Sequence, residues 1–418
     1  GGVPGVMPNL TRLAEEGIFF TNFYANSFRT DRGLVSILSG YPAQPTTSIM
    51  KYPVKSQSLP AISKSLRKEG YDVKVISTTD QNMLQCNDEV TYLPLGWKIR
   101  IGSLLTRIGM AEDYLDRWVS SGLEFFKKEN LTQEDLLIAT SVGEIGTLKL
   151  ASILKKLYNC KYIAHLHDPV KHAKMNGYKY DWKPHASREK TERNYLINAD
   201  YVVTCCNTYL EALHKKYSFL SNRLVNAHFG WIESVEKSNR KAENILRIAY
   251  GGNFGWPQSP EILAKAVEGL DGVEAVFIGK YQNYKPILRF TDKSNIRLID
   301  RMSHRDYIIY MQTNVDVAFL SLSKEYFSAC IPAKLYDYIN IGLPILASLP
   351  DGEAKKIIND NQYGIAVSID VNGLREAICS LLDDKVRRIF INNINLDKNK
   401  WNIKNQLYPL INLVHELS

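Results

Sequence analysis

The sequence predicts an α/β protein with two doubly wound parallel-sheet domains. From about residue 70 onward, short runs rich in β-branched residues alternate with amphipathic stretches of helical periodicity. Strands that alternate with helices in this way form parallel sheets covered by helices. A polar, charged stretch at 232–244 interrupts the alternation, so we place the boundary between the two sheets there.

Apolar runs locate the strands of each sheet. Those of the first sheet lie at 71–78, 135–141, 161–168 and 199–205, with a helix at 148–158. Those of the second lie at 245–252, 273–280, 296–300, 315–322, 343–348 and 364–369, with a helix at 259–270. We therefore expect domains at 71–235 and 236–418, preceded by a segment of different character at 1–70.

The composition is that of a soluble globular chain with a basic surface. Its 418 residues are 45% hydrophobic and 23% charged, with a formal net charge of +8. The charge suits an anionic partner such as a nucleotide or a phospholipid surface, and a solvated surface explains it as well. No apolar run is long enough to span a membrane, and no signal-peptide pattern is found. We expect a cytoplasmic protein, soluble or peripheral to the inner face of the cell membrane, with no nucleic-acid partner.

The six cysteines show no spacing typical of a metal site, which favours buried thiols in a reducing compartment. Four histidines (His165, His167, His172 and His185) are close in sequence but do not follow a metal-cluster pattern. We therefore predict neither a metal nor another cofactor.

A glycine-rich turn follows the first strand of the second sheet. Gly251, Gly252, Asn253 and Gly255 lie between this strand and a helix that is predicted to begin after Pro260. Such a loop presents backbone N–H groups and a helix N-terminus to an anion. Glycines at strand ends also form tight turns without any ligand, and this alternative stays open.

Lys334 is predicted to lie in the first turn of a later helix. Pro332 fits the start of this helix, and Gly342 ends it before the next strand. A lysine beside the positive end of a helix is unfavourable unless an anion lies between them. The pattern indicates a phosphate site, with a solvated lysine as the alternative.

Five stretches of the sequence resemble the retaining glycosyltransferases of family 4. Three lie in the second domain: YGGNFGWPQSPEIL, IPAKLYDYINIGLPILAS and DNQYGIAVSIDVNGLREAI. Two lie in the first domain, DLLIATSVGEIGTLKLASILKKLYNCKYIAHLHDPV and NADYVVTCCNTYLEAL, and the resemblance covers about residues 70–418. It implies a GT-B fold of two Rossmann-like domains, of which the N-terminal one is incomplete. The implied reaction transfers a sugar from a UDP- or GDP-linked donor to a polysaccharide or lipid-linked acceptor, with retention and without a metal.

The resemblance also implies roles for individual residues of the second domain. Lys334 would hold the donor diphosphate, and the backbone of Gly252, Asn253 and Gly255 would line the same site. Asp337 would take the place of the second acidic residue of the family's E-x7-E motif, near the donor sugar or ribose.

In the first domain, the resemblance implies that His167 and Asp168 face the donor sugar at the cleft between the domains. By spacing alone, a histidine at a strand end is more often structural. Ala329 stands where the family has the first glutamate of E-x7-E, and WPQSP at 256–260 replaces a basic pair that many members carry. These departures bear on donor affinity and donor identity, and Ala329 leaves a nucleotide-sugar-binding pseudoenzyme as an alternative. The replaced N-terminus is the reason to expect impaired activity.

Residues 1–70 resemble a different family, the sulfatases and lipoteichoic acid synthases of the alkaline phosphatase superfamily. The motif RTDRG at 29–33 would make Thr30 a metal-activated nucleophile. The family's metal ligands are not found along the chain, so a sulfatase or phosphoglycerol transferase acting through Thr30 is the alternative function. We expect 1–70 to be a silent remnant or an artefact of chain assembly, joined to the rest near Gly70.

One further segment, GWKIRIGSLLTRIG at 96–109, mixes basic and apolar residues. Trp97, Lys98, Arg100 and Arg107 could meet an anionic membrane surface, which suits a lipid-linked acceptor. A helix that covers its own sheet explains the pattern equally well.

Overall fold

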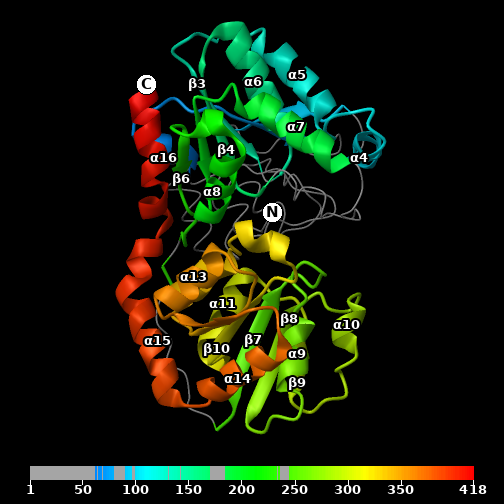
Figure 1. Ribbon diagram of the computed structural model, residues 1–418, viewed down its shortest axis with the longest axis vertical. Helices are drawn as coiled ribbons and strands as arrows, with labels where there is room; N and C mark the ends of the chain where they lie inside the picture. The colour runs from blue at the N-terminus through cyan, green and yellow to red at the C-terminus, as the bar shows by residue number, and fades with distance from the viewer. Residues whose placement is uncertain are drawn as a thin grey trace, which may run out of the picture.

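The computed structural model has two α/β halves, each built on a parallel sheet (Figure 1). It describes residues 62–79 without 64 and 68, 90–96, 99–129, 131–141, 143–169, 184–232, 234–235 and 244–418. The predicted α/β class with parallel sheets is therefore confirmed. Most of the predicted 1–70 segment, including Thr30, lies outside the described residues.

The N-terminal half contains a four-stranded parallel sheet in the order β3-β4-β5-β6. Its strands are Leu136–Ser141 (β3), Lys161–Leu166 (β4), Tyr201–Thr204 (β5) and Leu224–Asn226 (β6). Three helices alternate with them, namely Gly146–Tyr158 (α6), Pro184–Leu196 (α7) and Asn207–Lys216 (α8). Each strand pairs in parallel with its neighbour in sequence. Because all pairings are parallel, the C-terminal ends of the four strands lie at one edge of the sheet.

The C-terminal half contains a six-stranded parallel sheet in the order β12-β11-β10-β7-β8-β9. Its strands are Leu246–Gly252 (β7), Val273–Gly279 (β8), Ile296–Ile299 (β9), Val317–Ser321 (β10), Ile345–Ser348 (β11) and Gly364–Val367 (β12). The strand order reverses between β7 and β10, and ligands of open α/β sheets bind beyond the strand ends at such a point.

Helices cover both faces of this second sheet. They are Glu261–Val267 (α9), Lys285–Leu288 (α10), His304–Asn314 (α11), Lys334–Ile341 (α12), Glu353–Asp360 (α13) and Val371–Leu381 (α14). Alternate residues of one strand enter different cores: Ala249 packs with α11 and α12 residues, whereas Ile248 and Tyr250 pack with α9 and α14 residues. This alternation follows from the two-residue period of a strand and explains why nearly all of β7 is buried.

The end of the chain returns to the N-terminal half. Two helices, Asp384–Asp397 (α15) and Ile403–Leu417 (α16), run along one side of the molecule, with the 3-10 turn Lys398–Trp401 (η5) between them (Figure 1). Apolar residues of α16, among them Leu407 and Leu410, pack with Ile163 and Val203 of the first sheet. The last helix therefore completes the core of the first half.

A small parallel pair of strands, Val75–Thr79 (β1) and Val90–Pro94 (β2), precedes the first sheet. β2 was not predicted from the sequence. Two helices follow, Ile99–Arg107 (α4) and Asp116–Phe126 (α5), and α5 packs on α6 through Trp118 and Val119. Within the described residues, no helix combines the length and apolarity needed to cross a membrane.

Candidate functional site

The glycine-rich turn and Lys334 meet at the C-terminal end of β7. The side chain of Lys334 crosses directly over Gly252, where a Cβ atom would collide with the Nζ and Cε atoms of the lysine. Gly252 also has a φ of +134°, a backbone conformation that strongly favours glycine. Two independent constraints, one steric and one conformational, therefore require glycine at this position.

The side chain of Lys334 lies against Gly252 and the Tyr250 ring, and the residue as a whole is partly exposed. Its Nζ lies 4.2 Å from the centroid of the Tyr250 ring. Burial lowers the pKa of Lys334 to about 7, and the charge of Asp337 opposes this shift. Among the described residues, no carboxylate forms an ion pair with this ammonium group. An anion bound here would raise the pKa and restore the charge.

The loop after β7 is folded by its own hydrogen bonds. The Tyr250 hydroxyl donates to the carbonyl oxygen of Asn253, and the carbonyl oxygen of Gly255 accepts from the N–H groups of Gln258 (3.1 Å) and Ser259 (2.8 Å). Phe254 stacks in a group of rings that includes Tyr250. The loop thus holds a defined backbone path beside Lys334, and α9 begins at Glu261, immediately after Pro260 as predicted.

Helix α12 places Lys334 and Asp337 in its first turn. The helix begins at Lys334, so Pro332 lies just before it. The carbonyl oxygen of Pro332 accepts a hydrogen bond from the N–H of Leu335 at 3.0 Å. Asp337 is buried. The helix ends at Gly342, whose left-handed φ of +85° confirms the predicted stop.

Ala329, which stands where the family has the first glutamate of E-x7-E, is a packing residue in this structure. Ala329 ends the 3-10 helix Glu325–Ala329 (η4) and is 7% exposed. It belongs to the apolar cluster of the N-terminal half, and Ile331 packs against the same cluster. A small apolar residue at position 329 therefore packs between the two halves in place of a glutamate.

His167 and Asp168 follow β4 at the boundary between the halves. The His167 backbone N–H donates to the Ser141 carbonyl oxygen at 2.8 Å, which continues the β3–β4 pairing. Asp168 accepts a hydrogen bond from the Cys330 thiol at 3.7 Å. Cys330 lies in the C-terminal half, four residues before Lys334, so the structure brings Asp168 to the segment that leads into α12.

A chain of three buried side chains runs behind His167. The Nε2 atom of His167 lies 3.2 Å from Nδ1 of His165, and Nε2 of His165 lies 3.6 Å from Sγ of Cys205. Because each nitrogen of His165 faces a different partner, the arrangement is that of a hydrogen-bond chain. Burial lowers the pKa of His165 to about 4 and raises that of the Cys205 thiol well above its usual value.

These three groups have atoms within 4.8 Å of one another, and their chemistry would also suit a soft metal ion. Binding one would replace the hydrogen bonds of this chain and would require Cys205 to lose its proton. The His-x-His spacing could have revealed the first pair, since residues i and i+2 of a strand share a face. Nothing in the sequence indicated that Cys205 joins them.

A second junction between the halves centres on Glu353, at the start of α13. Its carboxylate accepts hydrogen bonds from the backbone N–H and side-chain amide of Asn207, and it lies 2.7 Å from Nε2 of His228. In return, the Thr208 hydroxyl accepts from the Glu353 N–H at 3.1 Å. A cavity of about 440 Å³ lies beside these residues, and Lys400 of η5 also lines it. Sequence reasoning missed this junction completely.

Residues 1–133, under a third of the chain, match the family model Sulfatase. The match contains the 1–70 segment, for which this resemblance was predicted, and continues through β1, β2, α4 and α5.

The solved structures that this chain resembles are GT-B glycosyltransferases. A sucrose-phosphate synthase from Thermosynechococcus elongatus aligns with a TM-score of 0.68 over 87% of this chain and 93% of its own, at 15% identity. HepE of Anabaena, solved in complex with UDP and glucose, aligns with a TM-score of 0.57 over 78% and 86%, at 12% identity. The lipopolysaccharide outer core galactosyltransferase WaaB aligns with a TM-score of 0.54 over 79% and 85%, at 13% identity.

At these identities the likeness shows the fold, and the fold is GT-B, as the family resemblance implied. Residues 134–418 are little more than two thirds of the chain, so an alignment over 87% of it includes part of 1–133. Part of the Sulfatase-like sequence is therefore aligned with a GT-B structure.

Proposed function

We propose that this chain is a glycosyltransferase that moves a sugar from a nucleotide diphosphate sugar to a polysaccharide or lipid-linked acceptor. The observation that carries the proposal is the contact between Gly252 and Lys334 at the point where the strand order reverses. The departing nucleotide diphosphate gains negative charge as the glycosidic bond breaks. An ammonium group next to a loop of backbone N–H groups is suited to stabilise that charge.

Uridine diphosphate is the proposed leaving group. HepE, whose fold this chain shares, was solved with UDP and glucose and also with UDP-glucose. That observation concerns HepE, and we extend it to this chain because both the fold and the Lys334 site suit a nucleoside diphosphate. GDP stays the second candidate.

Retention and independence from metal ions are further parts of the proposal. The positive charge of Lys334 and the backbone donors near Gly252 can neutralise a diphosphate without a divalent ion. His167 and Asp168, placed at the boundary of the halves by β4, are the proposed contacts to the donor sugar. Asp337, buried one turn beyond Lys334, is the proposed contact to the sugar or ribose.

The first experiment is a thermal-unfolding titration of the chain with UDP, GDP and ADP, with and without magnesium. A rise in Tm with one nucleotide that does not need magnesium, and that Lys334→Ala abolishes, would support the proposal. Lys265→Ala, which removes an exposed lysine of α9, is the matched control and should respond like the wild type. If millimolar concentrations of all three nucleotides leave Tm unchanged, the proposal fails.

A pseudoenzyme that binds nucleotide sugars is the alternative that Ala329 favours. It predicts the same Tm response but no release of UDP from any UDP-sugar, with or without acceptor. Steady UDP release from a UDP-sugar, lost in His167→Ala, would exclude it.

A second candidate function is metal-dependent cleavage of a phosphate or sulfate ester through Thr30, which the Sulfatase match to 1–133 favours. It predicts hydrolysis of an aryl phosphate or aryl sulfate that needs a divalent metal and is lost in Thr30→Ala. Equal hydrolysis by the wild type and Thr30→Ala would reject this function.

Because nucleotide sugars are made in the cytoplasm, we propose this location for the enzyme. A lipid-linked acceptor would further require access to the inner face of the cell membrane.

A further inference from the structure

Helix α4 and the turn after it display an exposed apolar surface. We call this surface the α4 stripe, and it consists of Ile101, Leu104, Ile108 and Met110, which are 49%, 53%, 53% and 75% exposed. The first three follow the i, i+3, i+7 spacing that places side chains on one face of a helix. Other large exposed apolar residues of the described chain, such as Leu157 and Leu396, are more widely spaced. Single exposed residues are ordinary, but a group of this kind marks an interaction surface.

The end of α4 has a fixed geometry. The Met110 N–H donates to the Leu105 carbonyl oxygen at 2.9 Å, and the Gly109 N–H donates to the Thr106 carbonyl oxygen at 3.3 Å. With Gly109 at a left-handed φ of +81°, these two bonds form a Schellman motif. The motif usually brings an apolar contact that covers its last residue, yet Met110 is largely exposed. The motif that ends α4 therefore leaves the apolar side chain of Met110 exposed to solvent.

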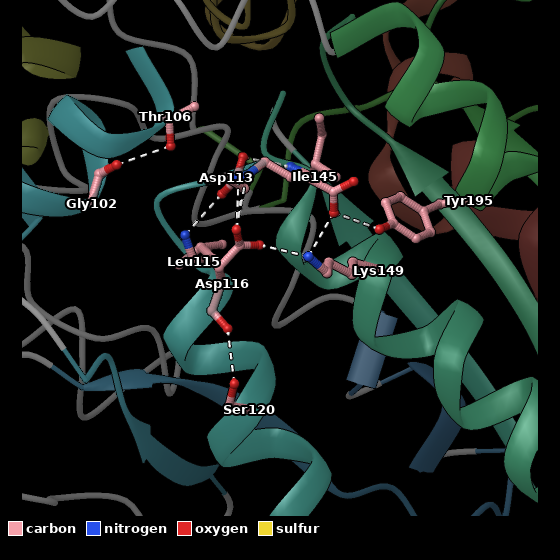
Figure 2. Close-up of polar contacts among 10 residues, drawn as sticks. Gly102, Thr106, Asp113, Leu115, Asp116, Ser120, Ile145, Lys149 and Tyr195 are labelled. Atoms are coloured by element: carbon pink, nitrogen blue, oxygen red, sulfur yellow. Dashed lines mark hydrogen bonds and ion pairs between the residues drawn. The ribbon is translucent and has the colours of Figure 1, made fainter. Parts of the chain in front are cut away.

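Buried polar contacts then anchor this segment to the body of the N-terminal half (Figure 2). The fully buried carboxylate of Asp113 accepts from the backbone N–H groups of Leu115 (3.0 Å) and Ile145 (3.1 Å). Ile145 directly precedes α6. The connection between α4 and α5 is therefore tied to the start of α6, so the position of the stripe is set by packed elements.

A second set of contacts neutralises the acidic residues that follow α4. Lys149 of α6 pairs with Glu112 at 2.6 Å and with Asp116 at 3.0 Å, and the Tyr195 hydroxyl donates to Glu112 at 2.7 Å (Figure 2). Burial would raise the pKa of Glu112, but the bonds from Lys149 and Tyr195 outweigh it and lower the pKa, so the pair stays charged. Because Lys149 is paired with both Glu112 and Asp116, these carboxylates repel an anionic surface less than unpaired carboxylates would.

The charges of α4 itself are all positive. The helix contains Arg100 and Arg107, no aspartate and no glutamate, and Lys98 precedes it in the sequence. Apolar side chains on one face together with basic residues are the pattern of a helix that lies in the plane of a membrane interface. In Figure 1, α4 lies at the margin of the N-terminal half, on the side opposite α16.

We infer that the α4 stripe docks on an anionic phospholipid bilayer, with its apolar side chains at the boundary of headgroups and acyl chains. The inference concerns a surface separate from Lys334 and does not depend on nucleotide binding. Docking through this surface would bring the chain close to a lipid-linked acceptor.

The test is sedimentation of the full chain with phosphatidylcholine vesicles that contain phosphatidylglycerol, and with vesicles of phosphatidylcholine alone. The wild type should sediment with the anionic vesicles and much less with the neutral ones. The triple variant Ile101→Ser/Leu104→Ser/Ile108→Ser should partition at least about tenfold less, because it removes the side chains that would enter the lipid. Leu157→Ser, which removes an exposed leucine of α6, should bind like the wild type.

The variants must keep their fold, which an unchanged Tm and an unchanged circular-dichroism spectrum would demonstrate. Equal sedimentation of the wild type and the triple variant would overturn the inference, as would equal binding to both kinds of vesicle. A dimer that the triple variant abolishes, without vesicle binding by the wild type, would assign the stripe to a second copy of the chain and would also overturn it.

Discussion

The backbone of Gly252 lies so close beneath the ammonium group of Lys334 that no Cβ atom fits between them. The two residues are 82 positions apart in sequence and come from a strand and a helix of the same half. Their contact explains why a glycine ends β7. It also makes the site sensitive to a change of one methyl group.

Gly252→Ala should therefore displace Lys334 and lower the stability of the chain by about 2–4 kcal/mol, through steric collision and backbone strain. Stabilisation by UDP should be lost at the same time. Gly269→Ala is the matched control, because Gly269 has a left-handed φ of +71° but nothing within 4 Å of a Cβ. It should cost about 1 kcal/mol and leave the UDP response intact. Chemical denaturation and a UDP titration measure both effects, and an unchanged UDP response in Gly252→Ala would contradict the assigned site.

UDP affinity should depend on pH through Lys334. With a pKa of about 7 in the free chain, the lysine loses its charge above neutrality, whereas a bound diphosphate favours the protonated form. Above neutrality, affinity should fall by up to about tenfold per pH unit between pH 7 and 9, until the pKa of the complex is reached. Lys334→Arg keeps its charge over this range and should flatten the profile. Calorimetry across this range measures the slope, and a flat wild-type profile would refute the prediction.

Glu353→Ala should loosen the junction between the halves. Burial acts to raise the pKa of Glu353, but hydrogen bonds and charge from His228 and hydrogen bonds from Asn207 outweigh it and lower the pKa. A carboxylate with a lowered folded-state pKa contributes stability above its unfolded pKa and loses it as pH falls through the folded value. We expect a loss of about 1–3 kcal/mol at pH 7 that shrinks under acid conditions below about pH 4. Glu376→Ala removes an exposed glutamate of α14 and should change stability by less than about 0.5 kcal/mol. A loss for Glu353→Ala that is independent of pH would contradict the ionic role.

His165 should make folding less favourable in weak acid. Its folded-state pKa of about 4 lies below the ordinary value of 6.5, so the unfolded chain binds the additional proton between these values. Stability should therefore fall as pH drops from 6.5 toward 4, by roughly 3 kcal/mol from this group. His165→Gln should remove this part of the pH dependence, whereas His304→Gln, at an exposed site, should keep it. Unfolding curves at several pH values provide the measurement, and identical slopes for wild type and His165→Gln would disprove the role.

The C-terminal half was the easier part to predict, for a physical reason. Its strands are buried on both faces, so they are continuous apolar runs bounded by glycine and polar turns, as β7 and β10 show. The end of α12 at Gly342 could be predicted because the left-handed backbone conformation after a helix strongly favours glycine. Of the site, the sequence suggested that Gly252 and Lys334 belong together, and the structure brings them into contact.

The parts that sequence reasoning missed all depend on long-range packing. Leu407 and Leu410 form an ordinary amphipathic pattern, and nothing local indicates that their helix packs on the first sheet. Glu353 and Asn207 lie 146 residues apart, and Cys205 joins His165 only through the pairing of β4 with β5. Residues 1–61 carry the prediction for Thr30, which lies outside the described residues and stays a prediction.

The return of α16 places two connections between the halves side by side. Within the described residues, the chain passes between the halves after Trp231 and again at Asn402, and a short parallel bridge joins these two passages. The Trp231 N–H donates to Trp401 and the Ile403 N–H donates back to Trp231, both at 2.9 Å. These backbone hydrogen bonds hold the two connections between the halves beside each other, and α16 packs with the half that comes first in the sequence.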